Sequence, residues 1–305
     1  MSGHSGALWK IMLGAAVAIG LLPMAASQSS PTNELSVSSS NPLNTDDDVS
    51  VGQQDFEDAD LRRAAQTDPR LLQNLNIIET DQEFDDATLN LTELRHKSKL
   101  GNTFFFVMHD NQDEAFDAMI WAVATFGGTG IAIENQEQRL LEGGVDLNLE
   151  FGRSSRPDLN YVFRTHIERA DITIALHNNQ THPTGSLHLN NPAYFTETCD
   201  AGDSVDDIVI MGDISSGDPG FCDRGQVQQM TANGLNVAWT RYGDRRSEAF
   251  DCSERCSFRK FVISYLGRTY FNLEARHGNG SQKQKKQVCN ILDPETATDA
   301  CKDLG

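Results

Sequence analysis

Positive charge is scarce in this sequence. The 25 lysine and arginine residues face 44 aspartate and glutamate residues, which gives a formal net charge of -19. A surface of this sign repels phosphate backbones and anionic membranes. We therefore expect no nucleic-acid partner and no stable association with a membrane.

A long hydrophobic run is also missing near the amino terminus. The run IMLGAAVAIGLL after Lys10 has about twelve apolar residues, whereas a membrane-spanning helix needs about 20. Small residues follow at 25–27, where a signal peptidase would cleave. We expect residues 1–27 to be a secretory signal peptide and the mature protein to be secreted or periplasmic. An uncleaved anchor is the alternative.

The amino-terminal half contains no cysteine, and all six cysteines lie in the last third of the chain. An even count behind a signal peptide indicates disulfides. We expect neighbours in sequence to pair, with Cys252 and Cys256 as the alternative ligands of a metal. The expected pairs are Cys199–Cys222, Cys252–Cys256 and Cys289–Cys301.

Apolar residues make up 38% of the 305 positions, enough for a buried core. Composition divides the rest into a disordered acidic and serine-rich linker (28–54), a charged helical extension (55–101) and a C-terminal tail (293–305). The acidic stretch 46–60 lacks the glycine and terminal glutamate of a calcium-binding loop, so we expect it to be solvated. The main domain is expected at 102–292.

Within 102–292, apolar runs alternate with stretches of helical period, and glycine and asparagine separate them. This alternation predicts an α/β fold, a mostly parallel or mixed sheet with helices on both faces. The expected strands are 103–109, 131–135, 171–179, 206–213, 235–239 and 269–275; the expected helices are 115–126, 158–170, 224–232 and 258–266.

His109, His177 and Glu274 each lie at the end of one of these predicted strands. Sheets of this kind bind ligands at the carboxyl ends of their strands, so one shared site is expected. Neutral imidazoles hold zinc while leaving a position for water. The alternative is that each histidine is a hydrogen-bonded structural residue.

These residues resemble the zinc carboxypeptidase and aminoacylase superfamily, which includes succinylglutamate desuccinylase-like proteins. The likeness covers about residues 102–282 and includes an oxygen-bearing side chain three residues after His109 and the Asp-x-Asn motif at 146–148. The segments LHNN (176–179) and NLEARHG (272–278) look like those of a bacterial branch. The resemblance implies a three-layer zinc-peptidase-like sandwich, a zinc cofactor and a peptide or acylated amino-acid substrate.

The resemblance also implies roles for single residues. His109 and His177 match the zinc-binding histidines, and Gln112 stands where the family has its zinc-binding glutamate. Glu274 matches the general base, which takes a proton from water and returns it to the leaving nitrogen. Because a neutral amide replaces an anion at Gln112, we expect zinc binding to be weakened or lost.

A second departure from the family concerns the substrate. Asn148 matches the asparagine of the Asp-x-Asn-Arg motif, but Leu149 stands in the place of the arginine, and leucine cannot bind a carboxylate through two parallel bonds. Arg139 is a candidate oxyanion donor that would act in catalysis together with Asn148. Arg153 or Arg156 are candidates to bind substrate in place of the lost arginine.

Two functions follow from these residues. The first is an exported zinc-dependent amidohydrolase or peptidase. The second is a catalytically impaired pseudo-hydrolase that acts as a secreted binding or effector module. His109, His177, Asn148 and Glu274 favour the first; Gln112 and Leu149 favour the second. A third alternative is a disulfide-stapled interaction protein that shares only the architecture.

Overall fold

A computed structural model describes residues 56, 58–84, 87–99, 101–136, 138–141, 144–151, 157–179, 197–213, 220–241, 257–294 and 298–304. The expected signal peptide, the linker 28–54, the pair Cys252–Cys256, and Arg153 and Arg156 lie outside these residues. Among the helices of the described ranges, none is long and apolar enough to cross a membrane.

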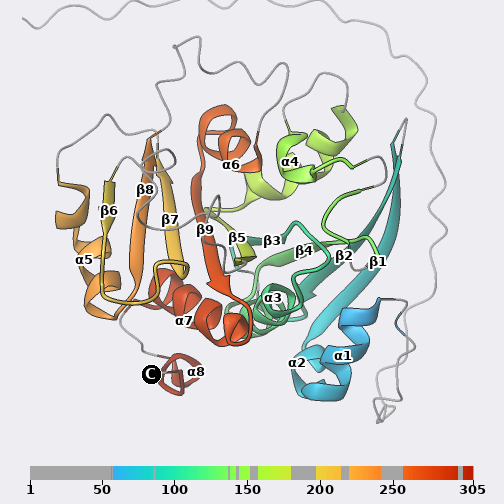
Figure 1. Cartoon of the computed structure of the whole chain (residues 1–305). Helices are drawn as coiled ribbons and strands as arrows, with labels where there is room; N and C mark the ends of the chain where they lie inside the picture. Colours follow the sequence, from blue (N-terminus) through green and yellow to red (C-terminus); the bar gives the residue numbers. More distant parts are fainter. Residues whose placement is uncertain are drawn as a thin grey trace, which may run out of the picture. The chain divides into compact units, whose positions relative to one another are not determined.

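Nine strands of the described residues form one mixed sheet (Figure 1). Their bounds are β1 Leu75–Phe84, β2 Ala87–His96, β3 Thr103–Val107, β4 Thr129–Glu134, β5 Ile172–Asn179, β6 Glu197–Cys199, β7 Ile208–Asp213, β8 Asn236–Arg241 and β9 Thr269–Arg276. The order is β1-β2-β4-β3-β5-β9-β7-β8-β6. Strands β4, β3, β5 and β9 run parallel to one another, as do β7 and β8, and the other pairs are antiparallel.

Helices cover both faces of the sheet, which confirms the predicted α/β class (Figure 1). One face carries α1 Ala59–Thr67, α2 Pro69–Gln73, α3 Asp113–Phe126, α5 Gly225–Ala232 and α7 Gly280–Leu292. The other carries α4 Pro157–Arg169 and α6 Phe258–Lys260, which continues as a π-helical turn, η4 Phe261–Tyr265. Shorter elements are η1 Leu147–Leu149, η2 Phe221–Asp223 and α8 Asp299–Lys302.

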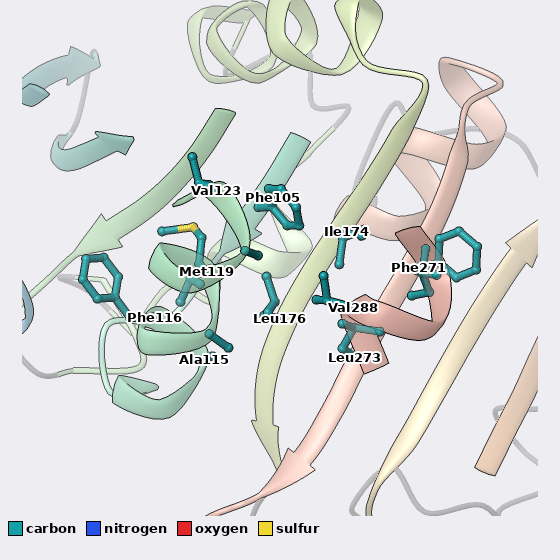
Figure 2. Packing of buried hydrophobic residues seen from close by; sticks show 14 of the residues in the cluster. Phe105, Ala115, Phe116, Met119, Val123, Ile174, Leu176, Phe271, Leu273 and Val288 are labelled. Atoms are coloured by element: carbon teal, nitrogen blue, oxygen red, sulfur yellow. The ribbon is translucent and has the colours of Figure 1, made fainter. Parts of the chain in front are cut away.

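The run TFFFV of β3 is buried on both sides because successive side chains of a strand point to opposite faces. Phe105 packs with α3 and α7, as Figure 2 shows for the apolar side chains between these helices and strands β5 and β9. Phe106 lies on the opposite face, with ring centroids 4.8 Å from Phe163 and 4.7 Å from Phe258. Burying each such side chain stabilises the fold by about 1.5–3 kcal/mol.

Helix α3 follows the sequence pattern that predicted it. Asp113 and Glu114 occupy its first turn, where negative charge suits the helix dipole. Its end is fixed by Gly127, whose φ of 82° is strained for residues with a Cβ. A Cβ there would also lie 2.6 Å from the carbonyl oxygen of Lys99.

The expected helical extension at 55–101 is wrong for most of its length. Helices α1 and α2 end at Gln73, and β1 and β2 follow as an antiparallel hairpin that adds to the sheet beside β4. Leu89 and Leu91 alternate with polar residues, a strand period that the surrounding charge obscures. Apolar residues occupy only one face of each stretch of these strands, and polar residues occupy the other face. No continuous hydrophobic run therefore marks the strands in the sequence.

Two of the three expected disulfides are confirmed. Cys199–Cys222 links β6 to η2, and Cys289–Cys301 links α7 to α8, each with Cα atoms 5.7 Å apart. The second bridge shows that the expected tail, 293–305, includes a helix tied to the main fold.

Candidate functional site

Three neighbouring parallel strands, β3, β5 and β9, bring the predicted site residues to one edge of the sheet. His109 follows β3 by two residues, and His177 of β5 is the direct neighbour of Glu274 of β9. The ring centroids of His109 and His177 are 5.6 Å apart. All three side chains are buried. The structure therefore brings His109, His177 and Glu274 together.

His109 is held in the form that a metal ligand needs. Its Nδ1 lies 3.2 Å from the backbone carbonyl oxygen of Arg139, which can only accept a hydrogen bond, so Nδ1 carries the proton. The other nitrogen, Nε2, is buried, and no described residue forms a hydrogen bond with it. Burial, and then the charge of Arg139, lower the pKa of His109 to about 4, so its Nε2 lone pair is available at neutral pH.

Gln112 is the residue that precedes the first turn of α3, and its side chain is buried. Its Nε2 donates to the backbone carbonyl of Asn178 at 3.4 Å, while its Oε1 has no hydrogen-bond partner in the part of the chain that the structure describes. The side chain of Asn178 in turn accepts from the N–H of Ala115 and donates to Glu114. The LHNN segment thus fixes the start of α3, and the Gln112 amide oxygen is left as an unsatisfied acceptor.

Two glutamines of α7 hold the backbone beneath the site. Gln284 Nε2 donates to the carbonyl of His177 at 2.7 Å, and Gln287 Nε2 donates to the carbonyl of Glu274 at 3.2 Å. Both are buried and lie one helical turn apart. Sequence reasoning missed them, although polar residues on the buried stripe of a helix are a signal that it could have used.

The carboxyl group of Glu274 is shielded from water and held by one side chain. Asn272 Nδ2 donates to Glu274 Oε1 at 2.9 Å. Burial raises the pKa of Glu274 to about 7, against the opposing effects of Asn272 and of the charges of Arg139 and Arg259. Burial, then His109 and the same two arginines, keeps the pKa of His177 well below its ordinary value.

Two arginines therefore act on this site. The Arg139 guanidinium lies 3.9 Å from a carboxylate oxygen of Asp146, whose other oxygen lies 3.9 Å from His109 Nε2. Arg259, from α6, was not predicted from the sequence. It is distant in sequence from every candidate residue, and only the packing of α6 over β9 places its charge near Glu274.

The Asp-x-Asn motif lies at the same end of the sheet. Asp146 accepts a hydrogen bond from the backbone N–H of Asn148 at 3.0 Å and so begins the turn η1. Asn148 therefore contacts Asp146 through its backbone N–H. Leu149, in the place of the family's arginine, is 42% exposed.

The residues fit a metal of the zinc type. Zinc in catalytic sites takes three protein ligands and leaves a fourth position open. Here two neutral imidazoles lie together, and His109 Nε2 and Gln112 Oε1 are buried acceptors that lack partners. Buried polar atoms of this kind normally have a partner, and a metal would supply one.

Comparison with known proteins gave no matching family model and no matching curated protein. Solved structures do match. A proposed metallopeptidase from Shewanella amazonensis is 12% identical, with a TM-score of 0.44 over 77% of this chain and 94% of that one. A succinylglutamate desuccinylase from Silicibacter is 14% identical, with a TM-score of 0.40 over 72% and 65% of the two chains.

A metallo-carboxypeptidase from Burkholderia cenocepacia is 13% identical, with a TM-score of 0.41 over 77% of this chain and 68% of that one. These are the classes of protein that the sequence resembles. Because identities are this low and the TM-scores lie below 0.5, the function of this chain is inferred below from its own residues.

Proposed function

We propose that this chain is an exported, zinc-dependent hydrolase that cleaves an amide bond of a peptide or an acylated amino acid. One observation carries the proposal. A buried carboxyl group, Glu274, lies beside two buried neutral histidines, one of which has an unpartnered ring nitrogen. Acid–base groups and metal ligands that meet in this way favour hydrolysis by activated water.

His109, His177 and Gln112 would hold the metal. When bound, zinc supplies a Lewis acid and lowers the pKa of water to about 7. The Arg139 carbonyl keeps His109 in the required tautomer, and the Asn178 carbonyl turns the amide nitrogen of Gln112 away so that its oxygen is the free acceptor.

Glu274 is the general base. Its pKa of about 7 suits a group that takes a proton from the attacking water and then returns it to the leaving nitrogen. Asn272 fixes one carboxyl oxygen, and Gln287 fixes the backbone, so the group is held in place before substrate binds.

Positive charge for the substrate comes from Arg139, and we assign Asn148 to act together with it. As the carbonyl carbon is attacked, negative charge develops on its oxygen, and a guanidinium directed at that oxygen stabilises it. Arg153 stays a candidate for binding substrate, and Arg259 joins it because its charge acts on both His177 and Glu274.

The second candidate is a binding module that has lost catalysis. Gln112 offers a neutral ligand in place of an anion, and the exposed Leu149 cannot form an arginine fork with a carboxylate. The two disulfides agree with an oxidising compartment, secreted or periplasmic, for either candidate.

The experiment that separates the candidates is hydrolysis by the full chain supplied with zinc. N-acyl amino acids and short peptides serve as substrates, and Glu274→Gln is the matched inactive variant. We expect turnover that falls by about 10² to 10⁴ in Glu274→Gln, the usual contribution of a general base. Binding of these compounds without turnover in the native protein would favour the binding module.

Matched substrates with free and amidated carboxyl ends test whether the site binds a substrate carboxylate. Because Leu149 cannot bind a carboxylate, we expect the rate to differ little between the two ends. A strong preference for the free acid would mean that another arginine replaces the missing one. Arg259→Gln and Arg139→Gln would then show which arginine it is.

A further inference from the structure

Three acidic side chains other than Glu274 lie together on the face of the sheet that α1 and α3 cover. Asp58, Asp110 and Glu134 each offer a carboxylate oxygen, and these oxygens lie within 4.8 Å of one another. They come from the start of α1, the segment after β3 and the end of β4. All three line a cavity of about 370 Å³.

Two of the three carboxylates accept hydrogen bonds from the backbone. Asp58 accepts from the N–H of Leu61, and its own N–H donates to Glu79 Oε1 at 2.9 Å. Asp110 accepts from the N–H of Asn135 at 2.6 Å. Like charges this close repel one another, so the arrangement is stable only with protonation or with a cation between them. Burial, then Asp58 and Asp110, raise the pKa of Glu134 to about 11.

A second observation points into the same cavity. Thr92 is fully buried and lines the cavity, and among the described residues its hydroxyl oxygen has no hydrogen-bond partner. Thr92 pairs with Glu79 across β2 and β1, so both side chains stand on the cavity face of the sheet. Oε1 of Glu134 is likewise buried without a hydrogen-bond partner. Leaving such groups unsatisfied costs about 1–3 kcal/mol each.

We propose that this cavity binds a calcium ion through Asp58, Asp110 and Glu134, with Thr92 contacting the ion or its water. Calcium takes six to eight oxygen ligands in flexible geometry, and the cavity has room for the water molecules that would complete the shell. The described residues that line the cavity include neither histidine nor cysteine, so their donors suit a hard cation and not zinc.

This site differs from a continuous calcium-binding loop, which the sequence does not favour at 46–60. Such a loop takes its ligands from one continuous segment, whereas these carboxylates come from three segments that only the fold brings together. A bound ion would tie α1 to the sheet and would fix Asp110, the residue next to His109. Calcium would thus stabilise the end of β3 from which the zinc site is built.

The test is isothermal titration of the full chain with calcium chloride, with zinc held constant. We expect one ion per chain, with a Kd of about 10⁻⁴–10⁻³ M, the range of extracellular modules. Glu134→Gln and Asp58→Asn should each weaken binding by at least about 10-fold. Glu93→Gln is the matched control, because Glu93 is next to Thr92 on β2 and points to the opposite face.

Thr92→Val removes only the hydroxyl and keeps the test decisive if a charge variant fails to fold. It should weaken calcium binding without destabilising the calcium-free protein, because the described residues give the hydroxyl no hydrogen bond to lose. No calcium binding to the native chain at 10 mM would overturn the proposal. Equal affinities in Glu134→Gln, Thr92→Val and the Glu93→Gln control would do the same.

Discussion

At position 112, glutamine and glutamate differ in more than charge. The glutamine amide donates to the carbonyl of Asn178, and a carboxylate in the same place would set two acceptors against each other. The environment therefore suits a neutral side chain when no metal is bound. A metal would reverse this preference, because an anionic oxygen binds a cation more strongly than an amide oxygen does.

Gln112→Glu should consequently have opposite effects in the two states. We expect zinc affinity to rise by about 10 to 100-fold or more, judged from the smaller effects of indirect ligand changes. The metal-free variant should unfold more readily by about 1–3 kcal/mol, because a buried acceptor loses its partner. Zinc competition with a chelator and urea unfolding measure the two effects. Gln112→Met, which lacks both the amide oxygen and the amide nitrogen, should lose zinc affinity.

Glu274 links the site to the pH dependence of stability. Its pKa in the folded state is about 7, above the ordinary 4.5, so the folded protein binds more protons than the unfolded chain between these values. Its contribution is fully present below pH 4.5 and is lost as pH rises through 7. The pKa difference corresponds to about 3 kcal/mol.

The metal-free Glu274→Gln variant should therefore match the native protein near pH 4 and exceed its stability by up to about 3 kcal/mol at pH 8. The lowered pKa values of His109 and His177 make stability rise with pH, the opposite of the effect of Glu274. Because both proteins contain these histidines, the difference between the two proteins reports Glu274. Unfolding in urea at the two pH values measures it. A difference that stays constant with pH would show that Glu274 is ionised throughout.

At the scale of elements, α7 acts as a frame for the site. Gln284 and Gln287 use their amide nitrogens to bind the carbonyls of His177 and Glu274, which lie on two adjacent strands. One helix thereby fixes the relative position of a proposed metal ligand and the proposed base.

Gln284→Leu should leave the carbonyl of His177 without a partner. We expect a loss of about 1–3 kcal/mol in stability and a drop in zinc affinity of about 10 to 100-fold. Gln282→Leu, on the exposed side of the same helix, is the matched control and should change stability by less than about 0.5 kcal/mol. If both variants bind zinc like the native chain, α7 does not position the site.

The elements differ in how well the sequence predicts them. β3, β5 and β9 are buried on both faces, so their continuous apolar runs mark them in the sequence. The hairpin β1–β2 lies at the edge of the sheet, where polar residues interrupt the apolar ones. Its strand character depends on pairing with β4, a tertiary contact that the local sequence does not encode.

At the scale of the whole molecule, strand-end position was enough to predict that His109, His177 and Glu274 meet. Gln284, which lies 107 residues from its partner His177, and Arg259 could not be predicted in this way. Their roles depend on how α7 and α6 pack against the sheet. Pattern analysis thus identified the residues at strand ends and missed those that hold or face them from helices.

The charge around the site is opposite in sign to the net charge of the molecule. The chain carries a net charge of -19, yet the side chains whose charges act on both His177 and Glu274 are two arginines, Arg139 and Arg259. If the chain is the hydrolase that we propose, we expect this local positive field to favour substrates with a negative or polar acyl group near the reacting carbon.

The zinc content of the full chain, purified without chelators and measured by elemental analysis, tests the central claim most directly. We predict up to one zinc per chain after equilibration with the metal, and a loss of that zinc in the double variant His109→Ala/His177→Ala. His166→Ala, which changes a histidine on α4 away from the site, should retain it. Equal zinc in the native chain and the double variant would contradict the proposed site.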